Sequence, residues 1–318
     1  MASPNVLLFG LGGIGGIYAA ILQLSGKCNG FKLISPKFGN HTFKFAGVYK
    51  SCQDAAASGQ KFSYVLCANK ALLDAVPSLS DLLRPVISNS TAIVLLQNGV
   101  GAEEPLHESF PTNSIISAVV WTGGRVLPEE DGLAGVEQFN REGLTIGVDY
   151  SPKLQKSVEE ERLDTLVGML EAGGGDCIVT QDIQSERWVK VIWNCAWNSL
   201  TTVSRLRTNR FLDSSPHALT LSYAVMNEVA AVAKAKGLTI PDGTVEKLIQ
   251  QCVSVKEGLP SSMLFDCLAK RGMEVEVILG TPLREGQRLG VPVPSLLALY
   301  SIVKALDWGN AHPEEAKI

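Results

Sequence analysis

The stretch Val6-Leu7-Leu8-Phe9-Gly10-Leu11-Gly12-Gly13-Ile14-Gly15 decides the fold class of this chain. Its first four residues form a short apolar run, which is typical of a buried parallel strand. The six residues from Gly10 to Gly15 match the pattern G-x-G-x-x-G, and an apolar helical pattern follows them. A glycine pattern that follows a strand and opens a helix predicts a turn that binds the pyrophosphate of a dinucleotide at the helix N-terminus.

The same N-terminal segment has two other interpretations. Residues 5–24 carry no formal charge and have the length of a membrane span. No basic residue precedes them, which argues against a signal peptide. The glycine spacing favours the nucleotide-binding turn, and no second long apolar run is present, so we expect no membrane association. A glycine-rich turn without a ligand is the alternative.

Apolar runs alternate with helical patterns through the N-terminal half. Residues 31–34, 64–67 and 92–96 are predicted strands, and residues 71–83 and 156–171 are predicted helices. This alternation predicts a parallel α/β sheet with helices on both faces. Three further β-type segments are expected to extend the sheet with an antiparallel or mixed portion: 114–120, 136–139 and 144–148.

From Asp182 onward nearly all of the sequence predicts helix. We therefore expect two domains, an α/β domain over residues 1–180 and an all-helical domain over residues 181–318. A length of 318 residues is sufficient for two domains with their own cores.

The composition describes a globular chain, with 46% hydrophobic and 19% charged residues. The formal net charge of -4 argues against nucleic-acid and anionic-membrane partners. The seven cysteines include no Cys-x-x-Cys pair, so we expect no metal site and no redox dithiol. Unpaired cysteines suit a reducing compartment, and the expected location is cytoplasmic.

Three segments of the α/β half are candidates for binding the cofactor. NAD-binding sites usually have an acidic residue at the end of the second strand, but Ser35-Pro36-Lys37 stands there. Ser35 and Lys37 could receive a 2′-phosphate, which favours NADP, unless Lys37 is an ordinary surface lysine. Lys70 and Asn98 each follow a predicted strand at the carboxyl edge of the sheet, where ligands bind in open α/β folds. The alternative for Asn98 is a simple Asn-Gly turn.

A polar row interrupts an apolar helical segment in the C-terminal half. Lys190, Asn194 and Asn198 recur every four residues within residues 187–200, so they share one face of a helix. Burying these groups without partners would be costly. Such a row favours a ligand cleft, and a satisfied structural network is the alternative.

A second polar cluster lies downstream. Ser261 and Ser262 are placed to cap a helix, and Asp266 is expected to share that first-turn role. Glu274 and Glu276 are expected to point in different directions, one toward a cleft and the other toward solvent or Arg271.

Hydride transfer to a ketone needs a proton donor at the oxygen, and Lys190, with Glu274 as its partner, could supply it. Asn194, Asn198 and Ser262 could position the substrate.

In their order and spacing, these motifs resemble those of the ketopantoate reductase family, and the resemblance covers nearly the whole chain. The resemblance rests on residues 10–15, 95–101 and 261–264, on Lys190 with Asn194 and Asn198, and on residues 271–280. It implies an N-terminal Rossmann domain and a helical domain like the C-terminal domain of 6-phosphogluconate dehydrogenase. It implies NADPH-dependent reduction of ketopantoate to pantoate in pantothenate biosynthesis, with the active site between the two domains.

The resemblance also implies roles for individual residues. Lys190 matches the general acid and Glu274 its partner, while Asn98, Asn194, Asn198 and Ser262 match contacts to substrate or nicotinamide. The dinucleotide contacts are Gly10, Leu11, Gly12, Gly13, Ile14, Gly15, Lys37, Lys70 and Asn98. The family usually has an Arg after the second strand, where this chain has Ser35-Pro36-Lys37, a Pro where it has Ser199, and an Asn where it has Thr208.

These departures leave two other functions open. A related 2-keto acid or ketone reductase would keep Lys190 and Glu274 but have a different pocket, which would also involve Trp193 and Trp197. A non-catalytic NADP-binding sensor would bind the cofactor without turnover, and the intact Lys190 and Glu274 argue against it. A homodimer is compatible with the sequence, which leaves the oligomeric state open.

Overall fold

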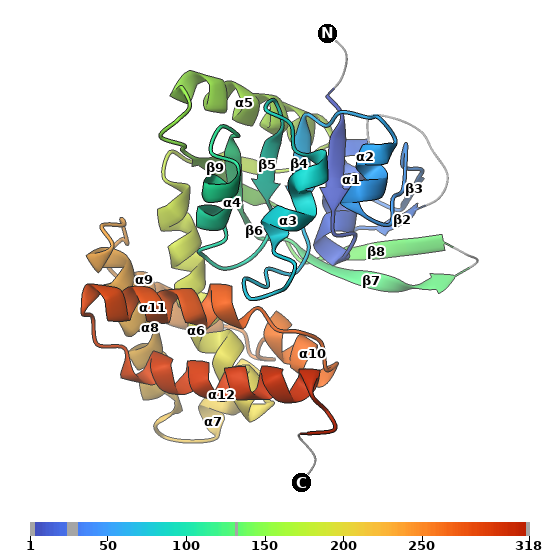
Figure 1. Ribbon diagram of the computed structural model, residues 1–318. Coiled ribbons are helices and arrows are strands. Elements are labelled where there is room, and N and C mark those ends of the chain that lie inside the picture. Colours follow the sequence, from blue (N-terminus) through green and yellow to red (C-terminus); the bar gives the residue numbers. More distant parts are fainter. Residues whose placement is uncertain (1–3, 24–30, 131–132, 316–318) are drawn as a thin grey trace. The chain divides into compact units, whose positions relative to one another are not determined.

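The computed structural model describes residues 4–23, 31–130 and 133–315 (Figure 1). Its contacts divide the chain into two compact units. The first unit holds the described residues up to Lys70 together with Ala75–Gln97 and Glu103–Ile183. The second holds Gln184 and the described residues after it, together with two short segments of the N-terminal half, Ala71–Asp74 and Asn98–Ala102.

A six-stranded sheet forms the centre of the first unit, in the order β1-β4-β5-β6-β9-β10. Strands β1, β4 and β5 are parallel, as the alternating pattern predicts, and β6 pairs parallel with β5 at the start of the mixed portion. Strand β9 pairs antiparallel with β6, and β10 pairs parallel with β9. The strands are β1 (Val6–Phe9), β4 (Tyr64–Cys67), β5 (Ala92–Leu95), β6 (Ile115–Val120), β9 (Leu144–Asp149) and β10 (Cys177–Val179).

A second sheet of four strands has the order β3-β2-β8-β7. Its strands are β2 (Phe31–Ile34), β3 (His41–Phe43), β7 (Gly123–Glu130) and β8 (Leu133–Phe139). The predicted strand at 31–34 is confirmed, but its expected place in the parallel sheet is wrong, because β2 pairs parallel with β8 and antiparallel with β3. The expectation that 136–139 extends the main sheet is wrong for the same reason. Gly135 permits this pairing, since a Cβ there would lie 2.8 Å from the carbonyl oxygen of Lys32.

Helix α1 (Gly13–Gln23) packs against strands of both sheets. Its Ile17, Tyr18 and Ile21 are buried in one core with Leu66 of the first sheet and Val136 of the second. The other helical elements of this unit are α2 (Cys52–Ala57), α3 (Leu79–Leu83), η1 (Arg84–Val86), α4 (Glu103–Ser109) and α5 (Lys156–Ala172).

The predicted helix over 71–83 is found only at α3. Pro77 lacks an amide hydrogen and disfavours a helical conformation at the residue before it. The amide of Ala71 donates to Glu274 Oε1 at 3.0 Å, so it is used in a tertiary contact. Side-chain contacts therefore hold this segment in place of helical hydrogen bonds.

The second unit is helical, as predicted, among the residues that are described from Gln184 to Glu315. Its core surrounds α6 and includes Trp188, Ile192 and Trp197. The elements are α6 (Ile183–Ser204), α7 (Thr208–Asp213), α8 (Ala218–Ala235), α9 (Thr244–Val253), α10 (Ser262–Leu268), η2 (Glu276–Gly280), α11 (Thr281–Leu289) and α12 (Pro294–Ala311). Element η2 is a π-helical turn, a feature that often occurs at functional sites.

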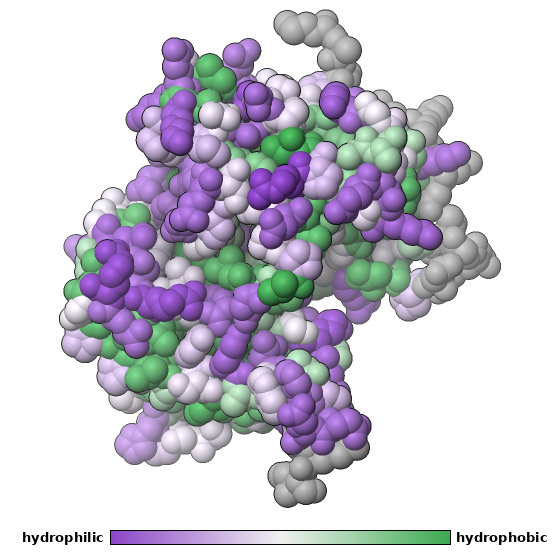
Figure 2. Space-filling model, in the orientation of Figure 1, coloured by the Kyte–Doolittle hydropathy of each residue, from purple (hydrophilic) through white to green (hydrophobic). Residues whose placement is uncertain are grey.

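Within the described residues, the helices are too short or too polar to cross a membrane. Hydrophilic side chains cover much of the face shown in Figure 2, with smaller hydrophobic areas between them.

Candidate functional site

The glycine-rich turn has the backbone that its pattern predicts. Gly10 has a φ of 100°, which favours glycine, and α1 begins at Gly13. A Cβ at Gly15 would run into the carbonyl oxygen of Gly10, and a Cβ at Gly13 would lie 2.5 Å from the carbonyl oxygen of Gly124. Gly12 is different, because a Cβ there would meet no atom within 4 Å. The fold therefore needs Gly13 and Gly15, whereas the space beside Gly12 is open to a ligand.

Asn69 lies against this turn, and it was not among the predicted site residues. A Cβ at Gly10 would collide with the backbone of Ala68 and Asn69, so the segment after β4 touches the turn directly. The side-chain amide of Asn69 donates to the carbonyl oxygen of Lys70 at 3.0 Å, while its Oδ1 is buried without a hydrogen-bond partner. A buried acceptor beside the turn is suited to a ligand hydroxyl or amide. Lys70 is exposed at the end of the same segment.

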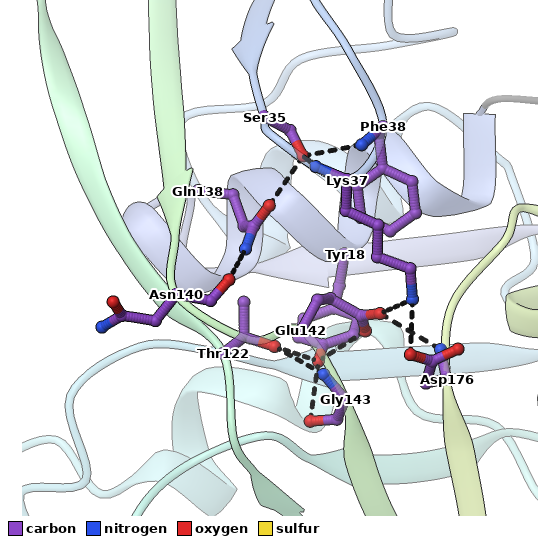
Figure 3. A network of polar contacts seen from close by, with 10 residues as sticks. All are labelled: Tyr18, Ser35, Lys37, Phe38, Thr122, Gln138, Asn140, Glu142, Gly143 and Asp176. Carbon is purple, nitrogen blue, oxygen red and sulfur yellow. Dashed lines mark hydrogen bonds and ion pairs between the residues drawn. The ribbon is translucent and has the colours of Figure 1, made fainter.

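Ser35 and Lys37 belong to the polar network in Figure 3. Lys37 Nζ forms ion pairs with Glu142 at 2.5 Å and Asp176 at 2.8 Å. Ser35 Oγ donates to Gln138 Oε1 at 2.6 Å. Both side chains that were expected to meet a 2′-phosphate thus already have protein partners.

The polar row on α6 lies in the second unit. Asn194 and Asn198 are buried, with 6% and 4% of their surfaces exposed, and Lys190 is partly buried on the same helix. Burial lowers the pKa of Lys190 to about 8; the nearby Arg187 acts in the same direction and Glu274 opposes both. A lysine with this pKa exchanges its proton near neutral pH, as a general acid must.

Arg187 is a second residue that the sequence reading missed. It is 2% exposed and lies three residues before Lys190, so the two share a face of α6. Its fixed positive charge disfavours the protonated form of Lys190. The i,i+3 spacing of two basic residues on an apolar helix was the available signal.

These charges predict a pH profile. If Lys190 is the proton donor, kcat/KM for reduction should be constant below about pH 8 and fall above it. In Arg187→Met, the pH above which kcat/KM falls should rise by up to about one unit. The loss of a neighbouring positive charge raises the pKa of Lys190. Arg210→Met, at a largely exposed arginine of α7, is the control and should leave this pH unchanged. A decrease in this pH, or no change, in Arg187→Met would contradict this electrostatic role.

Glu274 lies just before η2 and is 6% exposed. It interacts electrostatically with Lys190 and accepts the amide of Ala71 through Oε1. The segment 71–74 has a second attachment, since Asp74 pairs with Lys304 at 2.5 Å and Lys304 pairs with Glu276 at 2.9 Å. Glu274 can therefore act both on Lys190 and on the backbone that directly follows Lys70.

The two residues that follow Asn98 are attached to the same part of the helical unit. The amide of Val100 donates to the carbonyl oxygen of Val277 in η2 at 2.9 Å. Gly99 has a φ of 90°, and a Cβ there would lie 2.5 Å from Val277 Cγ2. On the other side, Cys195 Sγ of α6 donates to Ile278 of η2 at 2.7 Å. Element η2 thus brings α6 and the Asn98 segment together.

The structure partly corrects the predictions for the second polar cluster. Ser261 is the N-cap of α10 and accepts the amide of Leu264 at 3.0 Å, as predicted. The cap role of Asp266 is wrong, because its carboxylate lies beyond the first turn and accepts from Arg271 at 2.9 Å. Glu276 is buried and pairs with Arg284 at 2.6 Å, so the expectation that it faces solvent or Arg271 is wrong. Ser262 is exposed at the start of α10.

The residues that depart from the family pattern have structural contacts. Ser199 Oγ donates to the carbonyl oxygen of Cys195 at 2.5 Å. Thr208 Oγ1 accepts the amide of Leu259 at 2.9 Å, which ties α7 to the segment before α10. Trp193 and Trp197 pack edge to face, and Trp197 Nε1 is buried without a partner.

A mostly parallel α/β sheet with a glycine-rich βα turn, together with a helical unit that carries a partly buried lysine, is typical of a two-unit oxidoreductase. Comparison with known proteins identifies the family. The ketopantoate reductase PanE/ApbA model matches residues 6–147, and the model of the C-terminal region of this family matches residues 182–307. The chain belongs to the ketopantoate reductase family.

Individual relatives agree with this assignment. The chain is 28% identical to a 2-dehydropantoate 2-reductase of Nostoc sp., over 98% of this chain and 97% of the relative. Among solved structures it is similar to 2-dehydropantoate 2-reductase from Methylococcus capsulatus, with 30% identity, a TM-score of 0.82 and coverage of 96% and 98% of the two chains. The corresponding protein from Geobacter metallireducens gives 27% identity, a TM-score of 0.78 and coverage of 95% and 99%.

Proposed function

We propose that this chain reduces a 2-keto acid to the 2-hydroxy acid with a nicotinamide dinucleotide, and that its substrate is ketopantoate, which becomes (R)-pantoate for pantothenate biosynthesis. The observation that carries the proposal is Lys190, a partly buried lysine with a pKa of about 8 beside Glu274. The names of the relatives support ketopantoate as the substrate.

The first unit has features that fit a dinucleotide. The open space beside Gly12 lets a pyrophosphate approach the backbone, and the N-terminus of α1 favours its negative charge. The buried Oδ1 of Asn69 offers an acceptor next to this position, and Lys70 offers a cation. A bound reduced nicotinamide would supply the hydride that is added to the carbonyl carbon.

In the second unit, Lys190 Nζ donates its proton to the carbonyl oxygen of the substrate, which gains negative charge as the hydride arrives. Glu274 holds the protonated form of Lys190 against the opposing effects of burial and Arg187. Asn98, Asn194, Asn198 and Ser262 hydrogen-bond the remaining polar groups and orient the carbonyl group.

The substrate assignment is tested by product analysis. The purified chain is incubated with a reduced nicotinamide dinucleotide and either ketopantoate or one of a panel of other 2-keto acids, and the products and kcat/KM values are compared. The proposal expects the highest kcat/KM with ketopantoate and (R)-pantoate as its product. Preference for another keto acid by tenfold or more would contradict it.

A related 2-keto acid reductase is the second candidate. The observation in its favour is that Thr208 and Ser199 are engaged with backbone groups, at positions where the family pattern has Asn and Pro. This second candidate function differs from the first only in which 2-keto acid of the panel is the preferred substrate. Tight dinucleotide binding without turnover of any panel member would favour a non-catalytic sensor.

A further inference from the structure

We infer that the chain does not select the 2′-phosphate of NADPH through Lys37 and that it uses NADH at least as well as NADPH. This inference rests on the proposed function, because it concerns the reductant of that reaction. It departs from the NADPH preference that the family resemblance implies.

The position of β2 is the first argument. In dinucleotide-binding folds, the residue that meets the ribose 2′ position stands at the end of the strand that follows the glycine-rich helix in the nucleotide-binding sheet. In this chain β1 pairs with β4 in the six-stranded sheet, whereas β2 lies in the other sheet between β3 and β8. The end of β2, which carries Ser35 and Lys37, therefore belongs to a different sheet from the one that carries the glycine-rich turn.

The ion pairs of Lys37 are the second argument. Glu142, whose side chain is fully buried, and Asp176 both contact its ammonium group. Partial burial opposes the charged form, but hydrogen bonds to Asp176 and Glu142 raise the pKa of Lys37 overall. Two carboxylates around one ammonium leave an excess of negative charge. A 2′-phosphate that approached this position would meet excess negative charge, so the position is not suited to receive it.

Ser35 is occupied as well. Its hydroxyl donates to Gln138 and accepts the amides of Lys37 at 3.1 Å and Phe38 at 2.9 Å. Gln138 is only 1% exposed and in turn donates to the carbonyl oxygen of Asn140 at 2.6 Å. The hydroxyl that could have accompanied Lys37 on a phosphate thus fixes the turn after β2.

The network has a structural role that explains these contacts (Figure 3). Glu142 accepts from the hydroxyl of Tyr18 on α1 at 3.3 Å and from the amide of Asp176 before β10 at 3.1 Å. The Tyr18 hydroxyl also lies 2.8 Å from Thr122 Oγ1, directly before β7. Lys37 therefore links the end of β2 to α1 and to the main sheet, which accounts for its conformation without a ligand.

The test compares the two cofactors on the intact chain. Dissociation constants for NADPH and NADH are measured without keto acid, and kcat/KM for each is measured with ketopantoate. The variants are Lys37→Met and Lys37→Arg, with Lys44→Met, an exposed lysine after β3, as the matched control. We expect NADH to be bound and used at least as well as NADPH. The ratio of the two should change by less than about twofold in all three variants, since Lys37 does not contact the 2′ position.

Preference for NADPH by tenfold or more in the unmodified chain would overturn the inference. If that preference disappears in Lys37→Met and persists in Lys44→Met, Lys37 is the 2′-phosphate receptor. If the preference for NADPH persists in Lys37→Met, another cation receives the 2′-phosphate. Because the dissociation constants are measured separately from turnover, failure of the inference can be told apart from failure of the proposed function. A chain that binds neither dinucleotide would contradict both. NADPH-selective turnover would contradict the inference alone.

Discussion

Replacing Lys190 by methionine is expected to lower kcat for keto acid reduction by about 10²–10⁴-fold, the usual contribution of a positioned proton donor. Methionine keeps the length and apolar stem of the side chain on α6, so the helix should remain packed. The dissociation constant for the dinucleotide should be nearly unchanged, because the glycine-rich turn lies in the other unit. The measurement is steady-state kinetics together with dinucleotide binding and thermal unfolding.

Two variants make this result specific. Lys190→Arg keeps the positive charge but has a pKa too high for proton release, so it should not restore the rate. Lys234→Met, at a half-exposed lysine of α8, is the control and should retain full activity. A Lys190→Met variant with more than about a tenth of the original kcat would be inconsistent with a general-acid role.

Gly12→Ala is expected to weaken the binding of both dinucleotides by about tenfold or more, a free-energy loss of at least ~1.4 kcal/mol. The added Cβ meets no protein atom within 4 Å, so the melting temperature should stay within about 1–2 °C of the original value. Only a ligand that approaches the backbone at Gly12 would collide with it. Binding is measured by titration and stability by thermal unfolding.

Gly168→Ala is the matched control, since this glycine of α5 also has no atom within 4 Å of an added Cβ. It should leave binding unchanged and stabilise the helix by about 0.5–1 kcal/mol. Gly15→Ala should instead reduce stability, because its Cβ would run into the carbonyl oxygen of Gly10. If Gly12→Ala binds dinucleotides as tightly as the original chain, the turn does not hold a pyrophosphate in the expected way.

The sequence predicted the parallel strands, the glycine-rich turn and the helical second unit because each has a local signal. The place of β2 had no such signal. Residues 31–34 have the apolar character of a strand in either sheet, and their pairing with β8 depends on residues about a hundred positions away. The false helix over 71–78 has a similar cause, since Glu274 and Lys304 hold that segment. Tertiary contacts override local propensity in both cases.

The candidate site was predictable where its residues share a helix. Lys190, Asn194 and Asn198 follow a four-residue spacing, and α6 places them on one face. Asn69 was missed because its unpaired Oδ1 is a property of the folded environment, which no sequence pattern shows. The contact between Glu274 and Ala71 joins residues far apart in the chain, so no local sequence pattern could predict it.

The most direct test of the whole account is the oxidation of reduced nicotinamide dinucleotide by the purified chain in the presence of ketopantoate, with Lys190→Met beside it. The account predicts rapid oxidation that requires both the keto acid and Lys190, with NADH at least as effective as NADPH. Absence of keto acid-dependent oxidation with either dinucleotide, or oxidation that is equally fast in Lys190→Met, would contradict it.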